Sequence, residues 1–161
     1  MHRQNPDATE MKNAPLADAF YLEVANALSH CQNIELDLRL YIESAFDFLR
    51  LIAKDKMPFK IDRKKFEDQP LGKLIESFKP LTDKTELVAD IEKFRKLRNF
   101  VAHQAIVKGM DAQRNVSSEK VEEVRTKITE LIKLSEKIRQ QFGPEFMKLH
   151  LARFNHEQKS E

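Results

Sequence analysis

The chain contains few of the residues that build disulfides, metal centres or nucleotide-binding loops. Its one cysteine, Cys31, cannot form an internal disulfide, and its place in an apolar stripe favours a buried structural thiol over a reactive one. The three glycines form no glycine-rich phosphate-binding loop. The histidines lack the spacing of zinc ligands with this cysteine or with acidic pairs. The sequence therefore predicts no metal site and no cofactor, and a reducing cytoplasm fits the use of cysteine.

Long hydrophobic runs are also missing. The N-terminal segment, residues 1–15, is polar and lacks the apolar core of a signal peptide. No apolar run later in the chain reaches the length that a helix needs to span a bilayer. We therefore expect a soluble cytoplasmic protein without a membrane partner, with a flexible segment at residues 1–15 and a polar tail at residues 157–161.

The charge is nearly balanced overall but uneven along the chain. A net charge of +2 lacks the basic bias of many nucleic-acid-binding proteins. Residues 54–65 nevertheless hold six basic side chains against two aspartates, which gives this segment a charge of +4. A basic loop with Phe59 and Phe66 could follow an RNA backbone and stack on bases, but a solvated connection whose phenylalanines pack inward is the favoured alternative. The candidate RNA-binding residues are Lys56, Lys60, Arg63, Lys64 and Lys65.

The rest of the sequence has the composition and periodicity of helices. A third of the residues are charged, and the apolar residues recur every three or four positions. This spacing predicts one long amphipathic helix over residues 16–54, a loop over residues 58–70 and a short helix over residues 71–78.

A third amphipathic stripe runs from Leu87 to Ala105. It predicts a helix that Gly109 closes as a left-handed cap. Residues 110–116 form a connection, after which Ser117 or Ser118 can cap a fourth helix.

The fourth helix is expected to end at Gly143 and Pro144, and a last short helix covers residues 145–154. The pattern as a whole predicts an all-α, up-and-down helical bundle of four or five helices with a long first helix. The length of the chain favours a single domain, over residues 16–156.

Three of the apolar stripes contain one polar residue each, namely Glu35, Arg98 and Ser135. A charge directed into a helical bundle is costly unless it is paired, so we predict that Glu35 and Arg98 meet across the core, with Ser135 as a candidate for the same layer. On this hypothesis Glu35 holds the guanidinium group in one orientation. A buried pair that only fixes the register of the helices explains the two charges equally well.

The strongest functional signal is the stretch Arg98–His103, with the sequence RNFVAH. Arginine is a permanent planar cation and histidine exchanges a proton near neutral pH, so together they could bind and cleave a phosphodiester without a metal. Five helical steps place His103 about 140° around the helix from Arg98, on a second face with Phe100 and Val107. This face either packs against the short helices or contacts another subunit.

The RNFVAH stretch resembles the motif of the HEPN superfamily (higher eukaryote and prokaryote nucleotide-binding domains). These are helical bundles in which an arginine, usually followed by a polar residue, precedes a histidine by a few positions. The segments HCQNIELDLRLYI and LGKLIESF also resemble the abortive-infection and toxin-like branches, with lower specificity. The resemblance implies a metal-independent endoribonuclease that acts in defence, as a toxin or in a stress response.

The resemblance assigns roles to the residues of the motif. His103 acts as general base or acid when a ribose 2′-hydroxyl attacks the adjacent phosphate, and Arg98 stabilises the growing negative charge. The products would carry a 2′,3′-cyclic phosphate and a 5′-hydroxyl. Asn99 either positions the phosphate or the histidine, or caps backbone groups near the helix end.

The resemblance also implies partners. HEPN ribonucleases are typically dimers that bring two motifs together, so we expect a homodimer through the face that carries Phe100, His103 and Val107. An antitoxin or another protein is a further candidate partner. One toxin subgroup has a tyrosine at the position of Ala105, so the sequence does not support pairing with a nucleotidyltransferase antitoxin.

Two other interpretations stay open. The chain could be a non-catalytic helical module for dimerisation and for binding a protein or a nucleotide, or a helical bundle unrelated to HEPN domains. Exposure of His103 in a basic cleft shared by two chains would favour the nuclease, and burial of both Arg98 and His103 would favour the module.

Overall fold

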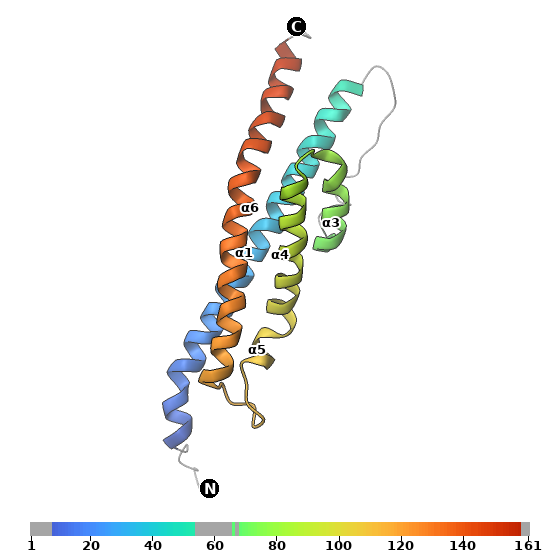
Figure 1. The fold of residues 1–161 in the computed structure, drawn as a ribbon. Helices are drawn as coiled ribbons and strands as arrows, with labels where there is room; N and C mark the ends of the chain where they lie inside the picture. The colour runs from blue at the N-terminus through green and yellow to red at the C-terminus, as the bar shows by residue number, and fades with distance from the viewer. Residues whose placement is uncertain (1–7, 54–65, 67, 159–161) are drawn as a thin grey trace, which may run out of the picture. The chain divides into compact units, whose positions relative to one another are not determined.

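The computed structural model describes residues 8–53, 66 and 68–158, and in that part of the chain it contains helices, turns and one isolated bridge, between Met110 and Val116. The fold is an all-α helical bundle with a long first helix, as the periodicity predicts. The elements are α1 (Ala8–Ala53), α3 (Leu71–Phe78), the 3-10 turn η1 (Lys79–Leu81), α4 (Thr85–His103), α5 (Ala105–Lys108) and α6 (Ser118–Gln158) (Figure 1).

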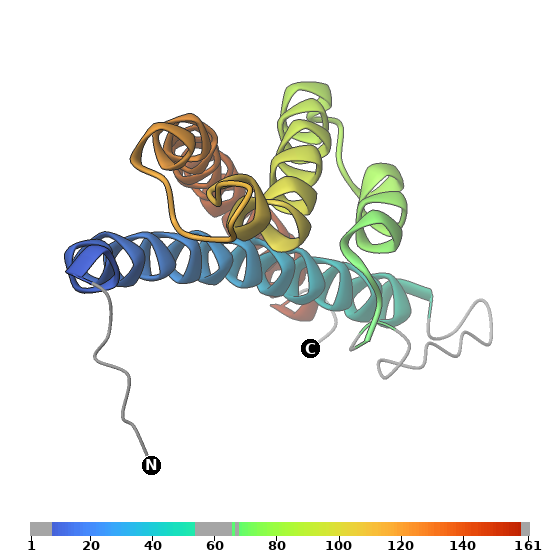
Figure 2. The ribbon, with the colours of Figure 1, turned by 90° about the horizontal axis from the view of Figure 1, so that it is seen from below.

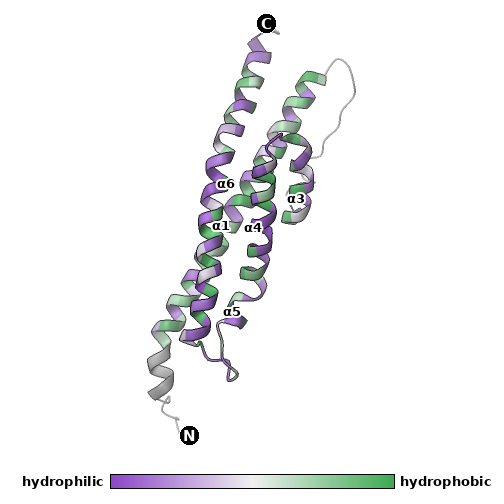
Figure 3. Cartoon of the chain, in the orientation of Figure 1, coloured by the Kyte–Doolittle hydropathy of each residue, from purple (hydrophilic) through white to green (hydrophobic). Residues whose placement is uncertain are grey.

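The chain divides into two compact units, each with parts of α1, α4 and α6. The first unit contains residues 8–30 and 96–133, and the second contains residues 31–53, 66, 68–95 and 134–158. Hydrophobic and hydrophilic residues alternate along α4 and α6, which is typical of helices that bury one side (Figure 3). The single domain over residues 16–156 stays a prediction.

The first unit has a mainly aliphatic core. Arg125 of α6 joins α1 by two hydrogen bonds to the carboxylate of Glu23, both 2.8 Å long. The loop before α6 is closed by Asp111, whose Oδ1 accepts hydrogen bonds from the backbone amides of Gln113 and Asn115. The buried apolar residues are Phe20, Val24, Ala27, Val101, Ala105, Val116, Val121, Val124, Ile128 and Leu131.

The second unit is built around aromatic rings. The ring centroid of Tyr41 in α1 lies 5.3 Å from that of Phe78 in α3 and 5.9 Å from that of Phe142 in α6. Phe146, one turn further along α6, lies 5.4 Å from Tyr41. Such edge-to-face contacts add stability to that gained from the apolar area that the rings bury.

The contacts within the second unit define the directions of its helices. α1 and α6 run parallel, because the contact of Tyr41 with Phe146 is followed along both helices by that of Phe48 with His156. α3 lies beside the first part of α4 (Figure 2), and an ion pair joins η1 to α4. The predicted short helix over residues 71–78 is confirmed.

The first helix begins earlier than the sequence predicts. α1 starts at Ala8 rather than at residue 16, and Pro15 lies inside it. An interior proline removes one backbone hydrogen bond. Residues 8–13 nevertheless include alanine, glutamate, methionine and lysine, which are good helix formers and favour the extension.

The predicted end of the fourth helix at Gly143 and Pro144 is wrong, because α6 runs through both residues to Gln158. The predicted separate helix over residues 145–154 is therefore the last part of α6. Gly143 and Pro144 are exposed, so water can bind the carbonyl group that loses its partner at the proline. Phe142 and Glu145 are buried, and their packing holds the helix against the core.

Candidate functional site

The candidate catalytic stretch lies at the C-terminal end of α4, in the first unit. α4 ends at His103, and the next residue, Gln104, has φ −126° and ψ −24°, which departs from helical geometry. The one-turn helix α5 follows. The predicted unbroken helix up to Gly109 is therefore wrong, whereas the predicted apolar stripe does extend to Ala105. The break lets α5 take its own direction, with Ala105 fully buried.

Gly109 permits a close contact and is not the left-handed cap that the sequence predicts. Its φ of −78° and ψ of −3° are right-handed values that any residue adopts. A β-carbon at this position would lie 2.6 Å from two atoms of the Phe20 ring. Glycine is thus required here by the neighbouring ring, which the local sequence does not reveal.

The three residues of the motif differ in exposure. Asn99 and His103 are exposed, whereas Arg98 is half-buried. Because Asn99 and His103 are four positions apart, they share one side of α4, together with the exposed Lys96. The amide and the imidazole are therefore open to a ligand that approaches from solvent.

A hollow of about 220 Å³ lies beside the motif, between α4, α5 and α6 of the first unit. The half-buried ring of Phe100 lines it, and the ammonium group of Lys127 lies 4.0 Å from the centroid of that ring. Sequence reasoning missed both lysines, because the register of α6 against α4 brings Lys127 to the hollow and the separate helix α5 brings Lys108. The residues that line the hollow are Phe100, Gln104, Lys108, Glu123, Val124 and Lys127.

The predicted contact face of Phe100, His103 and Val107 is not one continuous stripe. Phe100 lines the hollow, and the break at Gln104 separates Val107 from the helical repeat of α4. His103 and Val107 are both exposed, Val107 at 71 %. A homodimer through these three residues stays a prediction.

The predicted supporting residues belong to the second unit, whereas Arg98 belongs to the first. Glu35 is half-buried, and its Oε2 lies 3.8 Å from Nη2 of Arg39, one turn further along α1. Ser135 is fully buried. The contact of Glu35 with Arg98 and the place of Ser135 in the same layer stay predictions.

The candidate RNA-binding residues Lys56, Lys60, Arg63, Lys64 and Lys65 lie outside the described residues. Phe66, which follows them, is buried and stacks on Phe46, with 5.6 Å between the ring centroids. The packing of Phe66 agrees with the alternative that this segment is a solvated connection whose phenylalanines pack inward. The RNA-binding role of the five basic residues stays a prediction.

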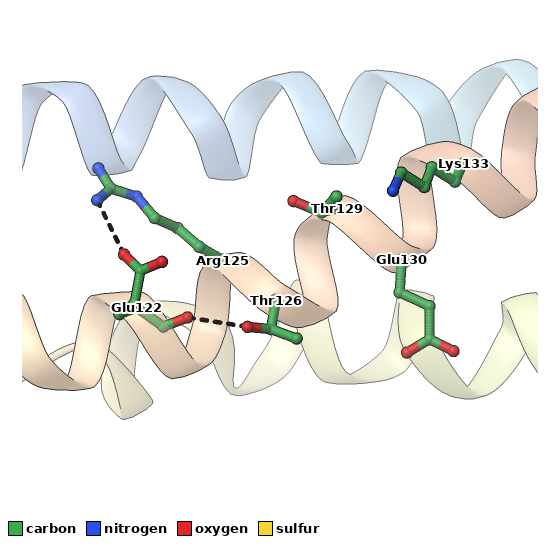
Figure 4. A pocket seen from close by; sticks show the side chains of 6 residues that line it. All are labelled: Glu122, Arg125, Thr126, Thr129, Glu130 and Lys133. Carbon is green, nitrogen blue, oxygen red and sulfur yellow. Dashed lines mark hydrogen bonds and ion pairs between the residues drawn. The ribbon is translucent and has the colours of Figure 1, made fainter.

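A second hollow in the first unit, of about 430 Å³, is lined by residues of α6 (Figure 4). Arg125 lies in its wall, and its hydrogen bonds to Glu23 raise the pKa of the guanidinium group. Nη1 of Arg125 also donates a hydrogen bond of 3.4 Å to Oε2 of Glu122. The hydroxyl group of Thr126 donates one to the backbone carbonyl of Glu122. The arginine of this hollow is therefore engaged in holding α6 to α1.

The described residues form neither a metal-ion site nor a membrane-spanning helix. In those parts of the chain, no group of three or more histidine, cysteine or acidic side chains is placed to hold a metal ion. No helix there is long and apolar enough to cross a membrane.

Comparison of the chain with family models, curated proteins and solved structures finds no match. A functional conclusion must therefore come from the motif and its surroundings.

Proposed function

We propose that this chain is a metal-independent endoribonuclease of the HEPN type, which cleaves RNA by attack of a ribose 2′-hydroxyl. The observation that supports the proposal is the exposure of His103 at the end of α4, next to the exposed Asn99 and the lysine-lined hollow. An exposed imidazole can reach a ribose from solvent. Histidine is also the side chain that most often serves in proton transfer near neutral pH.

The proposed reaction needs one proton acceptor and one proton donor. His103 accepts the proton of the 2′-hydroxyl while O2′ attacks phosphorus and the bond from phosphorus to O5′ breaks. O5′ takes a proton from a protonated imidazole, which a second copy of the chain would supply. Arg98 stabilises the negative charge on the phosphate oxygens, and the amide of Asn99 donates a hydrogen bond to one of them.

The proposal includes a second copy of the chain. Arg98 and His103 lie about 140° apart around α4, so one copy directs them to different sides of the helix. On α5, Ile106 and Val107 are 42 % and 71 % exposed, which offers apolar surface close to the histidine. A cytoplasmic location and an antitoxin or other protein partner belong to the same proposal.

A non-catalytic module for dimerisation and for protein or nucleotide binding is the second candidate. The half-burial of Arg98 favours it, because an arginine held partly inside a bundle can serve to fix the register of the helices. For such a module, Arg98→Ala would lower the free energy of unfolding, and the wild-type protein would leave RNA intact.

The test incubates the purified protein with mixed cellular RNA in excess EDTA and identifies the RNA ends. Arg98→Ala and His103→Ala, shown to be folded by circular dichroism, should each lower cleavage by at least about 100-fold. His150→Ala is the matched control, because it removes an exposed histidine from the second unit. We expect cyclic phosphate ends with the wild type and with this control.

Two results would contradict the nuclease. Equal cleavage by wild type and His103→Ala would mean that the motif is not the catalytic site. Intact RNA with the wild-type protein would leave the non-catalytic module as the better explanation.

A further inference from the structure

The hollow beside the motif combines the kinds of side chain that recognise nucleotides. Phe100 offers an aromatic ring, Gln104 an amide that both donates and accepts hydrogen bonds, and Lys108 and Lys127 two ammonium groups. The helix break at Gln104 separates α5 from α4, so Lys108 reaches the hollow from a different element than Phe100. Phe100 lies one helical turn before His103, so the hollow adjoins the motif.

We propose that this hollow is a subsite for one unpaired nucleotide of single-stranded RNA. The inference rests on the proposed function, since it places the nucleotide next to His103. It names the substrate class that the motif alone leaves open. The hollow has a volume of about 220 Å³, which is below the range of sites for drug-sized ligands and suits one base with its phosphate.

Both lysines of the hollow are available to a phosphate group. Across the described parts of the chain, neither Lys108 nor Lys127 forms an ion pair, although Glu123 lines the same hollow. The contact of Lys127 is with the ring of Phe100. A cation is held only weakly over a partly exposed phenylalanine ring, whereas a phosphate oxygen is a strong, charge-assisted acceptor. A phosphate can therefore draw Lys127 away from the ring.

The movement of Lys127 uncovers a face of Phe100, on which a base then stacks. Stacking of this kind requires a base whose face is free, and a base inside a duplex is covered by its neighbours. Gln104 lies at the same hollow and can form hydrogen bonds with the edge of the stacked base. One ligand thus uses the aromatic ring, the amide and both ammonium groups.

The test measures binding of a fluorescein-labelled, single-stranded 2′-O-methyl oligonucleotide by fluorescence anisotropy. The methyl groups prevent attack by the 2′-oxygen, so binding is separated from cleavage. Lys127→Met keeps the apolar stem and removes the charge, and Lys133→Met is the matched control on the same helix, at the second hollow. Both variants are first checked for an unchanged melting temperature.

Lys127→Met should raise the Kd about fivefold and lower the slope of log Kd against log salt by about 1. Lys133→Met should stay within about twofold of the wild type. Phe100→Leu should weaken binding by about tenfold or more, because stacking on the ring is lost. A duplex of the same sequence should bind less tightly than the single strand and respond less to Lys127→Met.

Equal effects of Lys127→Met and Lys133→Met would overturn the subsite, and so would equal affinity for duplex and single strand. Absence of binding to the wild-type protein overturns it as well, even if His103-dependent RNA cleavage is found. Binding that depends on Lys127 without any RNA cleavage keeps the subsite and removes the nuclease. The two proposals therefore fail separately.

Discussion

The two units of the chain are stabilised by different kinds of side chain. In the second unit, the rings of Tyr41, Phe78 and Phe142 lie within 5.3 to 5.9 Å of one another. In the first unit, Phe20 packs against Gly109 among aliphatic residues. Aromatic side chains bury more area than aliphatic ones, so the second unit should resist disruption better.

The lysines of the two units also differ. In the second unit, Lys137 lies 2.9 Å from a carboxylate oxygen of Glu86 and 2.8 Å from one of Asp90. In the first unit, Lys108 and Lys127 border a hollow without an ion pair to any described residue. Arg125 joins α6 to α1 in the first unit as well, so the difference concerns the lysines: Lys137 joins helices, whereas our proposal assigns Lys108 and Lys127 to a ligand.

The largest expected effect comes from Phe142→Ala, which empties the centre of the aromatic cluster. This side chain is 2 % exposed, so its loss should lower the free energy of unfolding by about 3–5 kcal/mol. Met147→Ala, at a residue of the same helix that is 60 % exposed, should change it by less than about 0.5 kcal/mol. Urea denaturation followed by circular dichroism measures both. Similar losses in the two variants would mean that the aromatic cluster does not stabilise the second unit as its burial suggests.

A pair of glycine substitutions tests how tightly the first unit is packed. Gly109→Ala should lower the free energy of unfolding by about 1–3 kcal/mol, because the new β-carbon meets the ring of Phe20. Gly143→Ala should raise the free energy of unfolding by up to about 1 kcal/mol. The new β-carbon would have no atom of another part of the protein within 4 Å, and alanine is the better helix former. Thermal unfolding distinguishes the two signs. A neutral Gly109→Ala would show that the ring moves aside easily.

The ion pair between Glu23 and Arg125 tests the role of charge in the first unit. A double-mutant cycle with Glu23→Gln and Arg125→Met should give a coupling of at most about 1 kcal/mol, because both side chains are about a third exposed. The coupling should shrink in about 1 M sodium chloride. The same cycle with Glu123→Gln and Lys127→Met is the control and should show no coupling.

The smallest effect is expected at Asp37 in the second unit. Burial raises the pKa of its carboxyl group. Nε of Arg139 lies 3.3 Å from Oδ2 of Asp37, and this cation lowers the pKa by less than burial raises it. The stability that such a group contributes is present below the unfolded pKa and is lost as the pH rises through the folded pKa. Asp37→Asn should therefore be more stable than wild type near pH 7 and lose this advantage near pH 3.

Urea denaturation at the two pH values measures this difference. An Asp37→Asn variant that is less stable near pH 7 would mean that the ion pair with Arg139 outweighs the cost of burial. In that case this ion pair would contribute to the stability of the second unit in addition to its aromatic packing.

The class of fold and most of its long helices follow from the sequence, because the spacing of buried residues is a local property of an amphipathic helix. The predicted helix ends are less accurate. Gly143 and Pro144 are strong local breakers, yet the packing of Phe142 and Glu145 keeps α6 continuous. The glycine at residue 109 has a purpose that only its neighbour Phe20 reveals.

The candidate site was predictable in its motif but not in its surroundings. The spacing of Arg98 and His103 along one helix placed them on different sides of α4. The position of Lys127 over Phe100 depends on how two helices are aligned, which no pattern within either helix records. The break at Gln104 was missed for a similar reason, because this residue carries no strong turn signal.

The chain's only cysteine has a practical consequence. Cys31 is 3 % exposed, so a thiol-specific reagent can modify the protein at one place and only when that part of α1 opens. The ratio of its modification rate to that of a free thiol gives the free energy of this opening under native conditions. Without any engineered label, the second unit thus carries its own reporter of native-state fluctuations.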